Sequence, residues 1–277
     1  MFRVASTNLA GLIAVVLGCA LGTAAAQDCV LPRVHHPWGR YQVGSWKEVR
    51  VTTETLGPDG RVLNTSVTET KSTLRSVSDL GVVLNVEVVV HVDGKEFASP
   101  PQTVWNGFYG QQESQPVTVR KLGEAVIKVH GNQVACEQRQ IQLDGTRGRQ
   151  ITVCYSPKIS PYVLRKETVT GGNDVRTVAE AVAVNHRTEI LGTVHPAALI
   201  KTTTTQGKST RVTVETVSDD VPGGVVEHDS QEFDDQGKVI RRSKLELLAY
   251  EVHEPRVGNE PQRRRLFHRR DRRPERM

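Results

Sequence analysis

The stretch LIKTTTTQGKSTRVTVETVSDDVPGGVVEHDSQEFDDQGKVIRRSKLELLAY, residues 199–250, decides the fold of this chain. It consists of segments rich in Val and Thr that are separated by turn-forming residues at Gly207-Lys208, Asp219–Gly224 and Asp234–Gly237. Alternating polarity favours half-buried β-strands, and Gly, Asp and Pro between such strands favour tight turns. The stretch therefore predicts four antiparallel strands joined by three short connections.

The same alternation recurs upstream of this stretch, from Ser45 onward, and is most regular in residues 82–92. There the apolar side chains occupy every even position: Val82, Leu84, Val86, Val88, Val90 and Val92. Only the Ala-rich centre of residues 175–186 also fits a helix. We predict an all-β protein with few or no helices. Its large, curved antiparallel sheet, a half-barrel or open barrel, has one apolar face and one solvated face.

Two parts of the chain match without gaps when one is shifted by 62 residues, which places residues 151–170 on residues 213–232. Each copy has an alternating strand, a Pro-containing corner and a strand that begins with two apolar residues. A duplication explains the match, with residues 45–170 and 175–252 as possible halves of the domain. Two ordinary β-corners that share turn chemistry explain it equally well.

The N-terminus predicts export. Residues 1–26 have a basic start, an apolar run and the small-residue site Ala24-Ala25-Ala26, which is typical of a secretory signal peptide. A lipoprotein attached through Cys19 is the alternative, because Val16–Cys19 resembles a lipid-attachment box. Residues 27–44 then form a leader segment, and residues 45–252 form the β domain of a secreted or periplasmic protein.

The positive net charge of +5 belongs to the C-terminal tail, residues 253–277. Residues 256–277 contain nine Arg and three acidic residues, so the β domain itself is slightly acidic. Such a tail has almost nothing to bury and is predicted to be disordered. It is either an inert terminus or a contact with an anionic envelope surface, whereas nucleic acid is not an expected partner. The oligomeric state is not predictable from the sequence.

Three cysteines follow the signal sequence, and an oxidising compartment favours a disulfide between two of them. Cys136 and Cys154 lie at equal distances from Gly145, within the hairpin-forming Asp144-Gly145 pair. We predict that these two residues face each other across a hairpin and form the bridge, although a bridge to Cys29 is the alternative. Cys29 is then unpaired or linked to another chain.

The segment between Pro101 and Pro116 interrupts the strands and contains three large aromatic residues, Trp105, Phe108 and Tyr109. A long loop in a compact domain is either functional or packed onto the core. We predict that the three aromatic residues bind a ligand at the mouth of the sheet. The alternative is that they plug the open end of the sheet as part of its core.

Catalytic and metal-binding patterns are weak. His35 and His36 are adjacent and so point to opposite sides of an extended chain, and no Cys or His near them has zinc spacing. The acidic pairs at residues 219–220 and 234–235 lie where turns are expected. No phosphate loop or nucleophile elbow is present. We therefore expect no metal, no cofactor and no catalysis.

The run Ser218–Val226, the acidic hairpin after it and the final Leu247–Tyr250 resemble uncharacterised exported bacterial β-proteins, which are distantly similar to LolA/LolB-type half-barrel lipoprotein carriers. The resemblance implies a curved sheet whose concave apolar face holds an acyl chain or another envelope component. The expected function is non-catalytic binding of an amphipathic ligand or envelope component. A structural protein of cell-surface assembly and a hydrolase with dispersed carboxylates are the alternatives.

Overall fold

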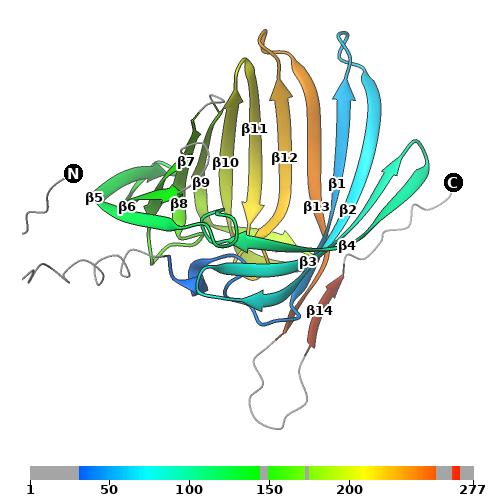
Figure 1. The fold of residues 1–277 in the computed structure, drawn as a ribbon. Coiled ribbons are helices and arrows are strands. Elements are labelled where there is room, and N and C mark those ends of the chain that lie inside the picture. Colours follow the sequence, from blue (N-terminus) through cyan, green and yellow to red (C-terminus); the bar gives the residue numbers. More distant parts are fainter. Residues whose placement is uncertain (1–30, 144–148, 172–174, 254–263, 269–277) are drawn as a thin grey trace, which may run out of the picture.

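The computed structural model describes residues 31–143, 149–171 and 175–253 and the backbone of residues 264–268 (Figure 1). The predicted signal peptide and Cys29 lie outside these residues. The described chain folds into one 14-stranded antiparallel sheet and one short 3₁₀ turn. These elements are η1 Arg33–His35, β1 Trp46–Leu56, β2 Val62–Val77, β3 Gly81–Val92, β4 Lys95–Gly107, β5 Val117–Val129, β6 Asn132–Leu143, β7 Arg149–Tyr155, β8 Val163–Thr170, β9 Val175–Ile190, β10 Thr193–Gln206, β11 Ser209–Val217, β12 Val225–Phe233, β13 Val239–His253 and β14 Arg264–His268.

The prediction of an all-β, curved and open antiparallel sheet is confirmed. The Ala-rich segment that also fitted a helix is strand β9. Within the described residues, no helix has the length and apolar character needed to cross a membrane. Part of the tail that was predicted to be disordered, Arg264–His268, is strand β14 and pairs with Ala249–His253 of β13.

The sheet consists of two meanders that join in its middle. Its strand order is β4-β3-β2-β1-β13-β12-β11-β10-β9-β8-β7-β6-β5, so β1–β4 form one meander and β5–β13 the other. Strand β1 pairs along its length with β13, from Trp46 opposite Glu251 to Thr55 opposite Arg241. The two edge strands, β4 and β5, follow each other in the chain and are connected by residues 108–116. This connection therefore spans the opening of the sheet.

Apolar packing brings the two ends of the sheet together at one end of the strands, which we call the base. Figure 1 shows the β3–β4 and β5–β6 hairpins lying across the lower part of the molecule, next to the upright strands. One buried cluster joins residues of both meanders and of the segments between them: Leu74, Val82 and Leu84 from β2 and β3, Ile141, Leu143, Ile151 and Val153 from β6 and β7, and Trp38, Tyr41, Phe108 and Tyr109 from the connecting segments. Side chains, rather than hydrogen bonds between β4 and β5, thus close the sheet at the base.

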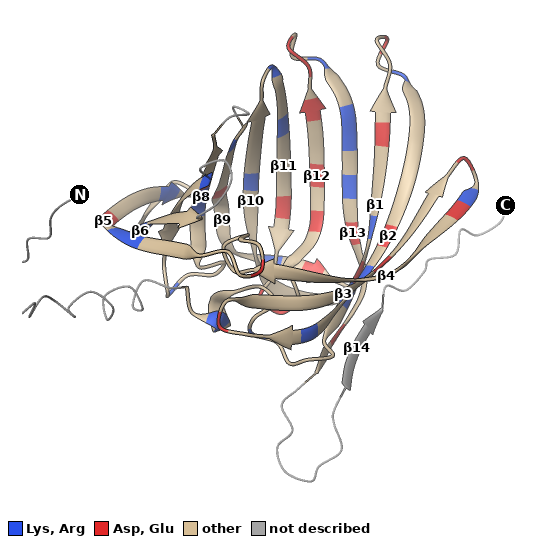
Figure 2. Ribbon diagram, in the orientation of Figure 1, with Lys and Arg blue, Asp and Glu red and all other residues tan. Residues whose placement is uncertain are grey.

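The opposite half of the sheet does not have the predicted apolar face. A row of directly paired hydroxyl side chains crosses six strands on the face that also carries the buried Leu247: Thr202, Thr213, Ser230, Ser243, Thr53 and Ser66. Figure 2 shows charged residues along the same parts of β12, β13 and β1. The alternation of apolar and polar faces therefore holds at the base and fails towards the hairpin tips, where both faces are polar.

The predicted correspondence at a shift of 62 residues is present in the backbone. It places β7–β8 on β11–β12 with the same register, since Cys154 lies opposite Arg165 and Thr216 opposite Glu227. Each hairpin has an irregularity directly after that pair. The corners match as well, because the Ser156 amide donates to the Tyr162 carbonyl at 2.7 Å and the equivalent Ser218 amide donates to the Gly224 carbonyl at 2.9 Å. The two hairpins are thus structurally equivalent, and their origin by duplication stays a prediction.

The predicted direct pairing of Cys136 with Cys154 is wrong in register. Cys154 lies opposite Gln138, so Cys136 is the diagonal neighbour of Cys154, two residues away along β6. Both side chains are buried free thiols in the structure. Burial and a hydrogen bond to Cys154 raise the pKa of Cys136 to about 12, which keeps this thiol protonated and unreactive at neutral pH.

The Cys136–Cys154 disulfide itself stays a prediction, since diagonal residues on one face of a sheet are close enough for long or soft side chains to touch. We expect exported protein to carry this bridge. Its mass, measured under denaturing and non-reducing conditions, is then lower than that of the reduced protein by the mass of two hydrogen atoms. Peptide mapping with a Cys136→Ser control locates the bridge. Labelling of both thiols in the unreduced protein would contradict it.

The closure at the base predicts a large effect of truncating Leu74, which is fully buried between the two ends of the sheet. We expect Leu74→Ala to lower the free energy of unfolding by about 2–5 kcal/mol, because it removes apolar contacts and leaves a cavity. Leu63→Ala is the matched control, since Leu63 is 68% exposed and its loss is expected to cost less than about 0.5 kcal/mol. Urea unfolding followed by circular dichroism measures both, and equal effects would show that the base core does not hold the sheet.

Candidate functional site

An apolar cavity of about 310 Å³ lies at the base of the sheet. Its floor is formed by side chains of strands β7 to β11: Ile151, Val153, Leu164, Ala181, Ile200 and Val217. Its roof comes from the two segments that lie between the ends of the sheet, through His36, Pro37, Phe108 and Tyr109. We call this space the base cavity. It has the largely apolar lining that is typical of small-molecule sites.

Specific hydrogen bonds fix the aromatic part of the roof. The Phe108 amide donates to the Leu80 carbonyl at 3.0 Å, and the Tyr109 amide donates to Gln111 Oε1 at 2.9 Å. Gln111 in turn donates through its amide nitrogen to the Leu80 carbonyl at 2.9 Å. A larger residue at position 107 would displace Gln111, because a Cβ atom at Gly107 would lie only 2.2 Å from the Gln111 side chain. The loop is therefore held in one conformation.

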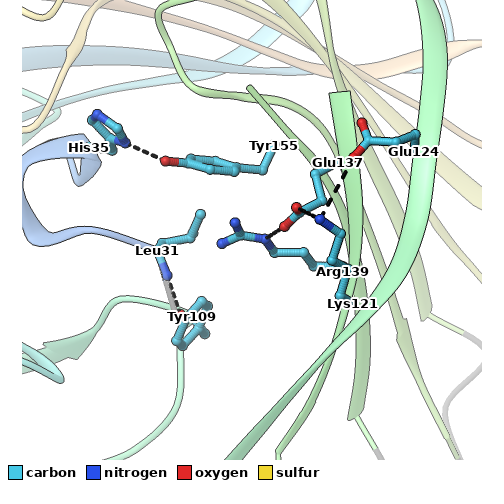
Figure 3. A network of polar contacts seen from close by, with 8 residues as sticks. All are labelled: Leu31, His35, Tyr109, Lys121, Glu124, Glu137, Arg139 and Tyr155. Atoms are coloured by element: carbon cyan, nitrogen blue, oxygen red, sulfur yellow. Dashed lines mark hydrogen bonds and ion pairs between the residues drawn. The ribbon is translucent and has the colours of Figure 1, made fainter. Parts of the chain in front are cut away.

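The segment before β1 completes the roof. Tyr109 Oη accepts a hydrogen bond from the Leu31 amide at 2.7 Å (Figure 3). His35 Nδ1 lies 2.6 Å from Tyr155 Oη, and its ring stacks on Tyr162 at 3.9 Å between centroids. His36 makes different contacts, with its ring 4.5 Å from that of Phe108. The adjacent histidines thus anchor the segment at two separate places.

A charged network supports the wall behind Tyr155. The Arg139 guanidinium lies 4.3 Å from the centre of the Tyr155 ring, and Glu137 pairs with both Arg139 and Lys121 (Figure 3). Burial opposes ionisation of Glu137, but the hydrogen bonds from Lys121 and Arg139 outweigh it and hold the pKa of Glu137 below its ordinary value. The buried charge of Arg139 is therefore neutralised by Glu137, and the network has a structural role.

A second, polar pocket of about 490 Å³ adjoins the base cavity on the side of the hairpin tips. It is lined by Arg149, Lys166, Thr168, Thr170, Val175, Thr177 and Ala179. Lys166 and Ala179 also line the base cavity, so the two spaces are adjacent. We call them together the amphipathic groove. An apolar end and a cationic, hydroxyl-rich end thus lie next to each other on one face of the sheet.

Lys166 marks the boundary between the two ends of the groove. It shares a face of β8 with the fully buried Leu164, because the two are separated by one residue. Burial and the nearby charge of Arg149 lower the pKa of Lys166 below its ordinary value. Arg149 also donates to the Gly110 carbonyl at 3.2 Å, which ties the polar pocket to the aromatic loop. Sequence reasoning missed both cations, although the position of Lys166 relative to Leu164 indicates an inward-facing side chain.

The structure separates the three aromatic residues that were predicted to bind a ligand. Phe108 and Tyr109, 8% and 5% exposed, belong to the core and also line the base cavity, and their role in ligand binding stays a prediction. Trp105 pairs with Val83, on the face opposite to the buried Val82 and Leu84, and does not line the cavity.

The acidic pairs act in turns and surface contacts. Asp234 accepts hydrogen bonds from the amides of Gln236 and Lys238, both at 2.9 Å, and so shapes the β12–β13 turn. Asp219 pairs with Arg40 at 3.0 Å and connects the β11–β12 corner to the N-terminal segment. Among the described residues, no group of three or more His, Cys, Asp or Glu is arranged to hold a metal ion.

Comparison with known proteins gives no family. No family model matches the sequence, and no curated protein matches it. One solved structure, described as that of a lipoprotein candidate from Parabacteroides distasonis, aligns over 75% of this chain and 94% of its own, with 10% sequence identity and a TM-score of 0.31. A similarity at this level carries no argument about the function of the chain.

The roof predicts a pH dependence of stability that comes from His36. The amides of Trp38 and Gly39 donate to His36 Nδ1, both at 3.2 Å, and burial, then Lys166 and Arg40, lower the pKa of His36 from 6.5 to about 4. The unfolded chain therefore takes up the proton first as the pH falls. Stability is full above about pH 6.5 and is lost progressively down to about pH 4.

Asn at position 36 keeps a side-chain acceptor for the two amides and does not titrate. We expect wild type to lose roughly 1–3 kcal/mol more than His36→Asn across this pH range. Urea unfolding at a series of pH values measures the difference. Parallel curves for the two proteins would show that His36 is not buried as a neutral side chain.

Proposed function

We propose that this chain is a non-catalytic β-protein that binds an amphipathic ligand in the amphipathic groove. The observation that carries the proposal is the position of the base cavity directly beside the polar pocket, with Lys166 and Ala179 lining both. A ligand with an apolar chain and a polar head matches this sequence of environments. The predicted signal peptide, residues 1–26, supports a place for this function outside the cytoplasm, in the bacterial envelope or beyond it.

The groove is suited to binding because its roof is already in place. The roof residues Phe108 and Tyr109 are fixed by hydrogen bonds that they accept from Leu31 and donate to Leu80 and Gln111, so a ligand does not have to order them. Pre-organisation of this kind increases affinity, since less conformational entropy is lost on binding. Each methylene group that leaves water for the base cavity contributes about 0.8 kcal/mol before such losses.

Charge pairing in the polar half of the sheet supports a non-catalytic protein. Three of its carboxylates are paired with cations: Glu54 with Arg242, Glu232 with Arg211 and Glu246 with Lys244. A carboxylate that is held ionised by a neighbouring cation is a weak general base. This arrangement favours binding over the alternative of a hydrolase that uses dispersed carboxylates.

The test measures binding of the apolar fluorescent probe N-phenyl-1-naphthylamine. We expect wild type to bind the probe with an increase in its emission, and Ala181→Phe to reduce binding about tenfold or more, because the added ring occupies the floor of the base cavity. Ala98→Phe is the matched control, since it adds the same ring to an exposed position of β4. Circular dichroism confirms that each variant is folded.

Two further variants test the assignment of the roof and do not depend on overpacking. Phe108→Ala is expected to weaken probe binding, whereas Trp105→Ala, on the other face of the sheet, is expected to leave it unchanged. If wild type does not bind the probe, or if Ala98→Phe and Ala181→Phe are equally affected, the proposal is wrong.

A further inference from the structure

We infer that the amphipathic groove is built for an amphiphile with an anionic head, a carboxylate or a phosphate, which Arg149 and Lys166 bind while the apolar chain lies in the base cavity. This inference rests on the proposed function and adds the chemical class of the ligand. It depends on three observations about the described residues: the lining of the polar pocket, the pairing of the neighbouring charges and a comparison between the two equivalent hairpins.

The lining of the polar pocket favours an anion. It combines two cations with the hydroxyl groups of Thr168, Thr170 and Thr177, and none of its lining residues is acidic. Guanidinium, ammonium and hydroxyl groups together form the donor set that carboxylates and phosphates require. The pocket shares Lys166 and Ala179 with the base cavity, so a ligand that occupies both spaces places an anionic head here and its chain among apolar side chains.

The cations on the other face of the same strands are paired with a carboxylate, whereas among the described residues those in the pocket are not. Arg165 and Arg176 both pair with Glu167, at 3.3 and 2.8 Å. In the described part of the chain, no carboxylate lies within ion-pair distance of Lys166 or Arg149. Burial and Arg149 lower the pKa of Lys166, and a bound anion relieves that unfavourable charge arrangement.

The second hairpin shows how the same scaffold neutralises such cations. The shift of 62 residues places Arg149 on Arg211, and each arginine lies opposite one residue of the second strand of its own hairpin. Arg211 lies opposite Glu232 and pairs with it at 2.9 Å, whereas Arg149 lies opposite Thr170. One hairpin thus supplies its own carboxylate, and the other leaves the equivalent position to a neutral hydroxyl.

The neighbouring position also has a carboxylate in the second hairpin alone, where Glu215 lies near the charge of Lys47. Lys166 corresponds to His228, and the residues opposite them are Val153 and Glu215. The second hairpin therefore has two inward carboxylates at positions where the first hairpin has a threonine and a valine. The missing negative charges of the first hairpin define the place that an anionic ligand would fill.

The comparison also provides the experiment. Thr170→Glu introduces a carboxylate opposite Arg149, as Glu232 lies opposite Arg211, and Thr170→Gln is the control of similar size without charge. Displacement of N-phenyl-1-naphthylamine measures binding of dodecanoate, dodecyl phosphate and the neutral dodecanol. We expect wild type and Thr170→Gln to prefer the anions, and Thr170→Glu to weaken both anions about tenfold or more and to change dodecanol by less than about twofold.

Lys166→Met is a second variant that removes one cation and keeps an apolar stem of similar length. It is expected to weaken both anions as well, whereas Lys208→Met, an exposed lysine at the β10–β11 turn, is expected to have no effect. The stronger of the two anions identifies the head group as carboxylate or phosphate.

The outcomes separate this inference from the proposed function. If wild type binds the probe and dodecanol but shows no preference for either anion, the inference is wrong and the apolar site stands. Equal losses for the anions and dodecanol in Thr170→Glu also overturn it, because they indicate a steric effect. If wild type does not bind the probe at all, both proposals fail.

Discussion

The packing of Leu74, Val82 and Leu84 against Ile151 and Val153 is the contact on which the rest of the structure depends. A long antiparallel sheet with two free edges must bury its apolar face, and strand pairing between the edges would do so by forming a closed barrel. Here the edges β4 and β5 do not pair, and side chains from the two ends meet instead. The sheet is therefore closed at the base by apolar contacts and open above it.

This mode of closure also makes the base cavity. The two ends of the sheet cannot reach each other directly everywhere, so Trp38, Tyr41, Phe108 and Tyr109 from the connecting segments fill the space between them. These bulky side chains fill it incompletely, and the remaining volume lies between Phe108 and the floor residue Leu164. The cavity is thus a consequence of closing the sheet with a roof, and the polarity of the sheet rises from the cavity towards the hairpin tips.

The strands and corners were predictable from the sequence, because alternation and turn residues are local signals. Side-chain direction was predictable only in part. Trp105 was grouped with Phe108 because the two are close in sequence, but a strand sends Trp105 to the face opposite Val104. The register of Cys154 was predicted two residues away from its observed partner, Gln138, because a slip of two residues keeps every side chain on its face and the alternation therefore does not exclude it.

The cations of the groove show why the site itself was less predictable than the fold. Lys166 and His228 occupy equivalent positions in the two hairpins, and so do Arg149 and Arg211. The pattern of each strand by itself therefore predicts the same side-chain direction for both members of each pair. What distinguishes them is the residue on the opposite strand, which depends on register. A comparable inward lysine, Lys47, illustrates the point: burial lowers its pKa to about 8, but it donates to the Val225 carbonyl at 3.1 Å and lies near Glu215, which favours its charged form. A cation in this sheet is therefore a structural element where a neighbour supplies a carboxylate and a candidate ligand contact where none does, and among the described residues no carboxylate pairs with Arg149 or Lys166.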